Sequence, residues 1–258
     1  MADPATVPLQ VRVTRTATRA LKALGLRDRV FELQQTRRRR ARMRAEAGGD
    51  YSASWPAALD MDRQLVAIIG EGPGYFIEAG ANDGYTQSNT YALERVHGWR
   101  GLLVEPMPQL AARATANRPA STVRSVALAP DTDLRSVRMR FGGLMTSVAG
   151  TQEDGWAAPV TQLGWEEEYE VDVPARTLSE LLDEAGAPAD ITLLSLDVEG
   201  YEASALAGLD LDRHAPRFLL IEIHEPDVNR PPIDAILGDR YREHSWLSHC
   251  DLLYERVA

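Results

Sequence analysis

Residues 75–90 read YFIEAGANDGYTQSNT, and this stretch decides the fold that we expect for the whole chain. Residues 75–77 form a short apolar run without a polar face, which is typical of a parallel strand buried on both sides. Gly80 and Gly84 follow, and glycine allows a tight turn and a close approach of the backbone to a ligand. Residues 91–96 then predict a helix, whose first N–H groups have no partner within the helix. The stretch therefore predicts a strand, a glycine turn and a helix, with a ligand at the turn.

The glycine turn differs from the dinucleotide-binding fingerprint G-x-G-x-x-G. Asn82 and Asp83 stand where that fingerprint needs glycine for contact with a pyrophosphate. Glu78, at the end of the predicted strand, would repel a pyrophosphate but suits a cation such as the ammonium of an amino acid. This combination resembles motif I of the class I S-adenosylmethionine-dependent methyltransferases. An ordinary strand-to-helix turn in another α/β protein is the alternative that this stretch alone leaves open.

Length and composition limit the class of protein. The chain has 258 residues, enough for one sizeable α/β domain with appendages or for two small domains at most. Its single cysteine, Cys250, cannot form an internal disulfide, which fits a reducing compartment. No run approaches the roughly 18 apolar residues of a transmembrane helix, and the N-terminus lacks the apolar core of a signal peptide. We therefore expect a cytoplasmic protein without a transmembrane segment.

Charge is distributed unevenly along the chain. Residues 1–50 hold 12 of the 28 Lys and Arg residues and only five acids, so this segment carries about +7 and the remainder about −17. An acidic body of this kind is a poor electrostatic match for DNA or RNA, and we expect no nucleic-acid partner. The basic run at residues 37–44 could contact a phosphate or an anionic surface. A solvated helix face explains it more simply, because no aromatic residues interleave the arginines.

The composition also suggests a domain boundary. Residues 1–50 show helical spacing of apolar residues, with Gly25 as a break between two helices. Glycine, serine and proline between residues 48 and 56 mark a linker, after which Asp60 could cap a short helix. We expect residues 1–58 to form an N-terminal helical, basic extension with its linker, and residues 59–258 to form the main domain. The helices of residues 1–50 are expected to pack on the main domain or on a partner subunit, and the second arrangement would make the protein a homo-oligomer.

A second strand is predicted over residues 101–106, with Glu105 at its carboxyl end and 25 residues after Gly80. A carboxylate at this place in Rossmann-like folds accepts hydrogen bonds from the hydroxyls of a ribose. A helix should follow from Pro108, and a third strand over residues 121–128. The end of this third strand, with Ser125 and Ala127, should lie near an adenine ring.

The region from about 131 to 177 interrupts the alternation of strands and helices. Residues 134–141 and 169–173 read as two added strands, and the segment between them contains Trp156 and Trp165. An insertion beside a ligand site often covers the substrate. The two tryptophans could stack on a sugar or an aromatic acceptor, although internal packing or a subunit interface would explain them equally well.

Acidic and basic side chains follow the two remaining buried strands. The strand at residues 191–196 leads into Asp197 and Glu199, and the strand from residue 218 leads into Glu222 and His224. Alternation places Glu222 and His224 on one face. Ligands bind an open α/β sheet at the carboxyl ends of its strands, so we expect these four side chains to meet at one site.

Three stretches together resemble the FkbM family of methyltransferases: the glycine turn with its SNT tail, GLLVEPMP, and LSLDVEGYEASALAGL. The resemblance spans about residues 70–225 and rests on thirteen matching positions: Glu78, Gly80, Asn82, Asp83, Gly84, Ser88, Asn89, Thr90, Glu105, Pro106, Asp197, Glu199 and Gly200. It implies an α/β fold with a Rossmann-like, doubly wound seven-stranded sheet. It also implies that S-adenosyl-L-methionine is the methyl donor and that a hydroxyl is methylated, on a sugar or on a glycosylated or secondary metabolite. Residues 1–60 and 142–168 carry no family signal.

The residues expected to bind the cofactor combine the resemblance with the strand reading. They are Glu78, Gly80, Asn82, Asp83, Gly84, Ser88, Asn89, Glu105, Pro106, Ser125, Ala127 and Asp197.

An alcohol is a weak nucleophile until its proton is drawn away, so a general base or a divalent cation is expected at the acceptor. His224 is our candidate base, because an imidazole changes its protonation near neutral pH. Asp197 and Glu222 are the other catalytic candidates. Asp197 and Glu222, with Glu199, could instead hold Mg²⁺ through oxygen ligands.

Two other functions stay open at this point. An N-methyltransferase on the same scaffold would need no strong base if the acceptor amine is neutral. A degenerate methyltransferase could act as a non-catalytic S-adenosylmethionine-binding module, although the intact acidic and glycine positions argue against it. In each case the partner is a small molecule.

Overall fold

The computed structural model describes residues 27–141, 147–148 and 169–257, and the chain divides into two compact units between Ala53 and Ser54. The first unit contains helix α2 (Arg27–Ala47), which carries the basic run predicted at residues 37–44. The helix is polar on all sides, and it ends where Gly49 adopts a positive φ of 84°. The predicted break at Gly25 lies outside the described residues, and the domain division at residue 58 stays a prediction.

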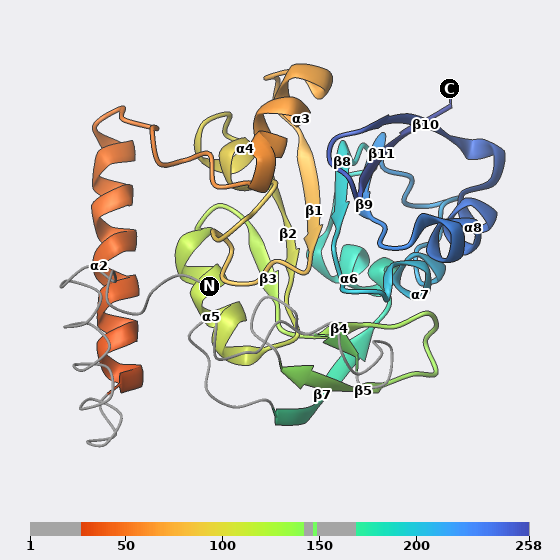
Figure 1. Ribbon diagram of the computed structural model, residues 1–258, viewed down its shortest axis with the longest axis horizontal. Helices are drawn as coiled ribbons and strands as arrows, with labels where there is room; N and C mark the ends of the chain where they lie inside the picture. Colours follow the sequence, from red (N-terminus) through yellow and green to blue (C-terminus); the bar gives the residue numbers. More distant parts are fainter. Residues whose placement is uncertain (1–26, 142–146, 149–168, 258) are drawn as a thin grey trace, which may run out of the picture. The chain divides into compact units, whose positions relative to one another are not determined.

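The second unit is built on a seven-stranded sheet with the strand order β10-β11-β9-β8-β1-β2-β3 (Figure 1). Its strands are β1 (Tyr75–Ala79), β2 (Arg100–Val104), β3 (Thr122–Arg124), β8 (Leu193–Leu196), β9 (Phe218–Glu222), β10 (Tyr241–Trp246) and β11 (Asp251–Arg256). Neighbours pair in parallel from β3 to β9, whereas β11 is antiparallel to both β9 and β10. This confirms the seven-stranded α/β fold, with the predicted glycine-turn strand β1 at its centre.

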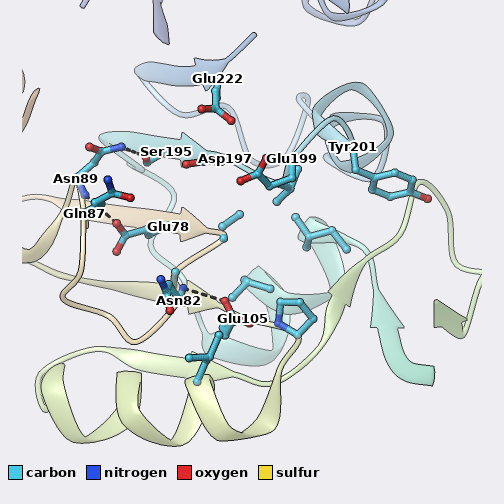
Figure 2. A pocket seen from close by; sticks show the side chains of 18 of the residues that line it. Glu78, Asn82, Gln87, Asn89, Glu105, Ser195, Asp197, Glu199, Tyr201 and Glu222 are labelled. Atoms are coloured by element: carbon cyan, nitrogen blue, oxygen red, sulfur yellow. Dashed lines mark hydrogen bonds between the residues drawn. The ribbon is translucent and has the colours of Figure 1, made fainter. Parts of the chain in front are cut away.

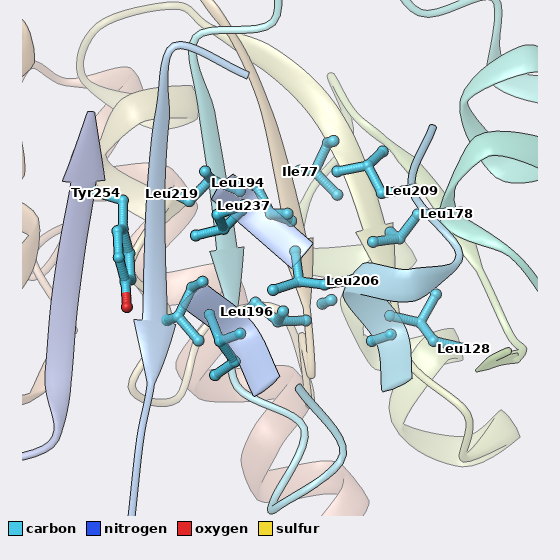
Figure 3. Close-up of a cluster of buried hydrophobic side chains, with 14 of the residues drawn as sticks. Ile77, Leu128, Leu178, Leu194, Leu196, Leu206, Leu209, Leu219, Leu237 and Tyr254 are labelled. Atoms are coloured by element: carbon cyan, nitrogen blue, oxygen red, sulfur yellow. The ribbon is translucent and has the colours of Figure 1, made fainter. Parts of the chain in front are cut away.

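Helices cover both faces of the sheet, as expected for a doubly wound fold. Helices α3 (Met61–Ile69), α4 (Tyr91–Arg95) and α5 (Pro108–Asn117) lie on one face. Helices α6 (Leu178–Ala185), α7 (Glu202–Ala207) and α8 (Pro226–Leu237) lie on the other. Figure 3 shows the leucine-rich core between this second group and the strands, where Leu194 and Leu219 are fully buried. Each such side chain stabilises the fold by about 1.5–3 kcal/mol.

The position of β1 creates the crevice of the fold. Along the chain, β1 is followed by β2 on one side and, much later, by β8 on the other, so the connections leave β1 in opposite directions. An open α/β sheet binds ligands at such a switch point, beyond the carboxyl ends of the strands. The residues after β1, β2, β8 and β9 therefore face a common space.

A second sheet has the order β4-β7-β5-β6, and all of its strands except β4 lie within the predicted insertion. Its strands are β4 (Ala127–Leu128), β5 (Ser136–Phe141), β6 (Ser147–Val148) and β7 (Tyr169–Arg176). The two added strands are thus confirmed, while the single third strand at 121–128 is wrong. That segment is divided between β3 in the large sheet and β4 in the small one, because β4 pairs with β7 instead of β2. Trp156 and Trp165 lie outside the described residues.

One helix start carries a complete capping box, and another differs from the start that the sequence predicted. Thr177 caps α6 with a complete capping box, in which Thr177 Oγ1 accepts from the Glu180 N–H and Glu180 Oε2 accepts from the Thr177 N–H. The expected cap at Asp60 is wrong, because Asp60 has a φ of 55° and makes no capping bond. Buried Asp62 accepts instead from the Ala57 N–H at 3.2 Å.

None of the helices in the described ranges is both long and apolar enough to cross a membrane.

Candidate active site

A cavity of about 480 Å³ opens at the carboxyl ends of β1, β2, β8 and β9. Its volume is in the range of pockets that bind small molecules. Figure 2 shows Glu105 and Asn82 bordering one side of it and Asp197, Glu199 and Glu222 bordering the opposite side. The small sheet contributes Met139 and Val148 to the lining. The cavity therefore joins the central crevice to the predicted insertion.

Most of the predicted site residues line this cavity. They are Glu78, Gly80, Asn82, Ser88, Asn89, Glu105, Pro106, Ala127, Asp197, Glu199, Glu222 and His224. Three predicted cofactor contacts, Asp83, Gly84 and Ser125, lie outside the lining.

Two of the three residues outside the lining, Asp83 and Gly84, have roles within the fold. Asp83 closes the glycine turn, because its carboxylate accepts from the Tyr85 and Thr86 N–H groups. Gly84 lies against α5, and a Cβ built on it would be 2.9 Å from Ala114 Cα. Ser125 is exposed. These positions in the motif hold the turn and the neighbouring helix together, and they need no cofactor to explain them.

Gly80 is required by the protein backbone. Its φ is 82°, and a Cβ at this position would lie 1.7 Å from the carbonyl oxygen of Asp197. The N–H groups of Gly80 and Ala81 both lie 3.1 Å from the Val104 oxygen, so the turn is fixed between β2 and β8. A side chain at Gly80 would displace β8 before it reached a ligand. Substitution of Gly80 would therefore test the fold and not cofactor contact.

Glu78 is the centre of a buried polar cluster. Its two carboxylate oxygens accept from Ser88 Oγ, from the Asn89 N–H and from Thr90 Oγ1 at 2.7–3.0 Å, and Arg118 Nη1 lies 3.0 Å away. These bonds use both oxygens, and the side chain is nearly inaccessible. These bonds give Glu78 a positioning role, and its contact with a ligand ammonium stays a prediction. Glu78 holds residues 88–90 in place along the cavity wall.

Arg118 was not predicted from the sequence. It is fully buried, and its guanidinium is 3.0 Å from both the Glu78 and Glu94 carboxylates. It also donates to Thr90 Oγ1 and to the Thr90 carbonyl. A single arginine after a helix gives no signal in the sequence. It becomes identifiable only when α5 is packed against the glycine turn.

Asn89 completes this wall of the cavity. Its Nδ2 donates to Ser195 Oγ at 3.1 Å, which links the SNT segment to β8 (Figure 2). Asn89 Oδ1 is buried and has no hydrogen-bond partner among the described residues. A buried acceptor without a partner costs free energy, about 1–3 kcal/mol. The side chain is thus suited to accept a hydrogen bond from a ligand.

Glu105 lies across the cavity, where the sequence predicted it. The Asn82 N–H donates to Oε2 at 2.8 Å, and the Met107 N–H donates to Oε1 at 2.9 Å. Each oxygen keeps a second lone pair for a ligand hydroxyl. Burial raises the pKa of Glu105 to about 7, against the opposing effect of the two N–H groups, and nearby Asp83 raises it further. The free protein therefore holds Glu105 near the midpoint of its titration at neutral pH.

The opposite side of the cavity is acidic. Asp197 lines the cavity. Desolvation by the surrounding protein and the charge of Glu222 both raise the pKa of Asp197. Burial also raises the pKa of Glu222, to about 7. Two close carboxylates share a proton because their charges repel. The raised pKa values of Asp197 and Glu222 therefore favour protonation of this carboxyl pair.

Glu199, Glu222 and His224 lie around this pair. His224 Nε2 is 3.2 Å from Glu222 Oε1, so the predicted base is oriented by a carboxylate. Glu199 has a positive φ of 55°, and its carboxylate lies with those of Asp197 and Glu222 within 4.8 Å. Glu202 does not join them, because its Oε1 accepts from the Val198 and Gly200 N–H groups and fixes the turn.

Residues 78–246 match the family described as Methyltransferase FkbM domain, which is more than half of the chain. The chain belongs to the FkbM methyltransferase family. The matched range contains the glycine turn, Glu105 and the acidic side of the cavity, and it supports S-adenosylmethionine-dependent methyl transfer as the general activity.

Two solved structures are similar to this FkbM protein. A TehB-like S-adenosylmethionine-dependent methyltransferase from Corynebacterium glutamicum has 10% sequence identity and a TM-score of 0.39, over 88% of this chain and 100% of the other. A S-adenosylmethionine-dependent methyltransferase from Aquifex aeolicus has 12% identity and a TM-score of 0.38, over 76% of this chain and 89% of the other. No curated protein matches the sequence significantly.

The cavity of the FkbM domain fits S-adenosylmethionine by its donors and acceptors. Glu105 offers two acceptor oxygens for a ribose diol, and Asn89 Oδ1 offers a buried acceptor for an ammonium group. Ala127 and Leu128 supply an apolar wall beyond Glu105. Glu105 lies across the cavity from Asp197, Glu199 and Glu222, which leaves the acidic side for the methyl acceptor.

Proposed function

We propose that this protein is an O-methyltransferase that methylates a hydroxyl of a sugar or of a glycosylated or secondary metabolite. The observation that carries the proposal is the pair of His224 and Glu222, 3.2 Å apart at the cavity wall opposite Glu105. An alcohol needs a proton acceptor before it attacks a methyl group, whereas a neutral amine does not. A carboxylate-oriented imidazole facing a cofactor pocket supplies that acceptor.

On the cofactor side, Glu105 and Asn89 are the residues that we assign to S-adenosylmethionine. Glu105 would accept from the ribose hydroxyls, and Asn89 from the ammonium of the methionine part. Gly80, Asn82, Pro106 and Ala127 shape the surface between them. Ser88 acts through Glu78, to which it donates at 2.8 Å. S-adenosylmethionine, when bound, supplies an electrophilic methyl group on a sulfonium.

On the acceptor side, His224 would take the proton of the hydroxyl as its oxygen attacks. Glu222 accepts from the imidazole and stabilises the imidazolium that forms, as an orienting carboxylate does in other base-assisted reactions. The enclosing protein and the charge of Glu222 raise the pKa of Asp197, which favours the neutral form of Asp197 on this wall. Positioning of the two substrates in line supplies much of the remaining acceleration.

Mg²⁺ bound by Asp197, Glu199 and Glu222 is the alternative way to activate a hydroxyl. Their oxygens lie within 4.8 Å of one another and are the donors that Mg²⁺ prefers. This alternative predicts that EDTA abolishes methyl transfer and that Mg²⁺ restores it.

A search for the acceptor should therefore be run with and without chelator. Purified protein would be incubated with methyl-labelled S-adenosylmethionine and a panel of nucleotide sugars, glycosylated metabolites and matched amines. Transfer to oxygen supports the proposal, whereas transfer to the amines alone would favour N-methylation.

Cofactor affinity should depend on pH through Glu105. The ribose diol requires the ionised carboxylate, and the pKa of Glu105 in the free protein is raised to about 7. Below that pH the carboxyl must first lose its proton, so affinity for S-adenosylhomocysteine should fall roughly tenfold between pH 8 and pH 6. Glu105→Gln should bind at pH 8 with an affinity lower by roughly 1.5–3 kcal/mol.

Glu105→Gln also distinguishes the contribution of Glu105 to the pH dependence of affinity from those of other titrating groups. Asp197 and Glu222 border the same cavity, so they contribute equally to the pH profiles of both proteins. The difference between the wild-type and Glu105→Gln profiles isolates Glu105. Calorimetric titrations at several pH values provide both profiles. Parallel profiles would show that Glu105 does not contact the ligand.

The N-terminal extension offers a separate prediction. We propose that residues 1–58 are an extension and that the cofactor site is complete without them, since the cavity-lining residues among those that the structure describes all lie between 78 and 250. A protein that starts at Gly49 should bind S-adenosylhomocysteine within about twofold of the full chain, while its oligomeric state or acceptor use changes. Calorimetry and light scattering test this. A truncated protein that folds but cannot bind the ligand would show that the boundary is wrong.

A further inference from the structure

Three side chains with different metal-binding atoms meet beside the acceptor wall. Glu222 ends β9, His224 follows it two residues later, and Cys250 immediately precedes β11. Glu222 Oε1 lies 3.2 Å from His224 Nε2 and 3.8 Å from Cys250 Sγ, and the three donor atoms are all within 4.8 Å of one another. All three residues line the cavity. The mechanism proposed above gives no role to Cys250.

We propose that Glu222, His224 and Cys250 bind a borderline divalent cation such as Zn²⁺, with a fourth position open to the cavity. Zinc bonds are about 2.0–2.1 Å to nitrogen and oxygen and about 2.3 Å to a thiolate. Tetrahedral angles then separate an oxygen and a nitrogen ligand by roughly 3.3 Å and an oxygen and a sulfur ligand by roughly 3.5 Å. The observed 3.2 and 3.8 Å are close to both values.

The backbone holds these ligands in place. The Ile223 N–H donates to the Cys250 carbonyl, and Glu222 is paired with Asp251 in the antiparallel ladder of β9 and β11. The Cys250 N–H is also bonded to Ser248 Oγ at 3.1 Å. The carboxylate and the thiol are therefore fixed to adjacent strands. Metal binding requires little reorganisation of the sheet, and this favours affinity.

The donor set selects the cation. A thiolate and an imidazole prefer zinc-class metals, while Mg²⁺ prefers oxygen ligands alone. The oxygen-only group of Asp197, Glu199 and Glu222 shares Glu222 with this site, so the two sites cannot be filled independently. Glu222 Oε2 is buried and has no hydrogen-bond partner in the described part of the chain, which leaves an acceptor for a cation. Binding would release the Cys250 thiol proton to solvent and form the sulfur–metal bond.

This site has a consequence for the proposed function and depends on it. A cation on His224 Nε2 occupies the nitrogen that faces Glu222, and it removes the imidazole from proton transfer. Zn²⁺ should then inhibit methyl transfer, and a chelator should restore it. Mg²⁺ activation predicts the opposite response to a chelator.

Cobalt(II) is a direct probe, because a cobalt–thiolate bond has a charge-transfer absorption that nitrogen and oxygen ligands lack. Cys250 is the only cysteine in the chain, so such a band has one source. The full-length protein, freed of metal, should bind one equivalent of Co²⁺ with this band, and Zn²⁺ but not Mg²⁺ should displace it. Cys250→Ser should lose the band and bind Zn²⁺ at least tenfold more weakly. His249→Ala, a histidine on the same cavity but outside the cluster, should keep both.

The variants separate the cation site from the proposed reaction. Cys250→Ser should retain methyl transfer and lose its inhibition by Zn²⁺, with S-adenosylhomocysteine binding as the check that the protein is folded. His224→Gln provides a second ligand variant if Cys250→Ser does not fold, and it should weaken Co²⁺ binding equally. A wild-type protein without the band, or equal displacement by Mg²⁺, would overturn the site. Absence of methyl transfer with an intact band would count against the proposed reaction alone.

Discussion

Replacement of Arg118 by leucine is expected to lower the free energy of unfolding by about 3–5 kcal/mol. Arg118 is fully buried and lies 3.0 Å from each of two buried carboxylates, Glu78 and Glu94. The variant keeps the aliphatic volume but leaves both carboxylates without their cation. Removing one partner of a buried ion pair costs more than the pair contributes, because the remaining charge is enclosed without compensation.

Urea unfolding of the wild-type protein and of Arg118→Leu at pH 7 measures this difference in the free energy of unfolding. The matched control is Arg138→Leu, since Arg138 forms a two-bond pair with Asp172 but about 60% of each side chain is exposed. An exposed pair of this kind contributes little to stability, so Arg138→Leu should leave the free energy of unfolding nearly unchanged. If Arg118→Leu and Arg138→Leu lower the free energy of unfolding by the same small amount, Arg118 does not hold the cluster together. The result bears on function, because the cluster fixes residues 88–90 and with them Asn89 on the cavity wall.

Replacement of His224 by alanine is expected to slow methyl transfer by about 10²–10⁴-fold, which is the usual contribution of a general base. Affinity for S-adenosylhomocysteine should change less than about twofold, since the imidazole lies on the acceptor side of the cavity. Added imidazole should restore part of the rate by entering the space left by the side chain. Rates would be measured at saturating cofactor with the acceptor found by screening, and with EDTA present to keep zinc-class metals away.

Two comparisons make the His224 result specific. His249→Ala removes another imidazole from the same cavity, and it should retain the wild-type rate. Asp197→Asn should slow the reaction less than His224→Ala, because Asp197 lies beside Glu222 and does not accept the acceptor's proton. An enzyme that EDTA inactivates, with a nearly normal His224→Ala variant, would assign activation of the hydroxyl to the carboxylates and a cation.

The sequence was sufficient for the centre of the fold because its signals there are local. Residues 75–84 predicted β1 and its glycine turn, and strand alternation placed Glu222 and His224 on one face. The carboxyl ends of neighbouring strands meet, so Glu105, Asp197 and Glu222 were predicted to share a site without knowledge of the tertiary structure. The cavity lining contains all of them.

The parts that could not be predicted depend on contacts between distant segments. Arg118 reaches Glu78 across 40 positions in the chain, and Cys250 reaches Glu222 across 28. Neither residue has neighbours in sequence that indicate its partner. The same limit applies to two glycines of the motif, whose contacts within the protein could not be predicted from the sequence. Gly80 and Gly84 match a binding motif, yet their close neighbours are Asp197 and Ala114 of the protein itself.

The third strand illustrates a different limit. Residues 121–128 have continuous strand propensity, and the sequence does not show that Thr122–Arg124 joins β2 while Ala127–Leu128 joins β7. That division moves Ser125 to the surface and Ala127 to the cavity. Which strand a residue pairs with is decided by tertiary context and not by propensity.

The central claim is that the cavity between Glu105 and His224 binds S-adenosylmethionine. Calorimetric titration of S-adenosylhomocysteine into the full-length protein at pH 8, repeated with Glu105→Gln, tests it most directly. We expect one binding site per chain in the wild-type protein and a loss of about tenfold or more in affinity in the variant. No binding by the folded wild-type protein, or equal affinity in both proteins, would contradict the claim.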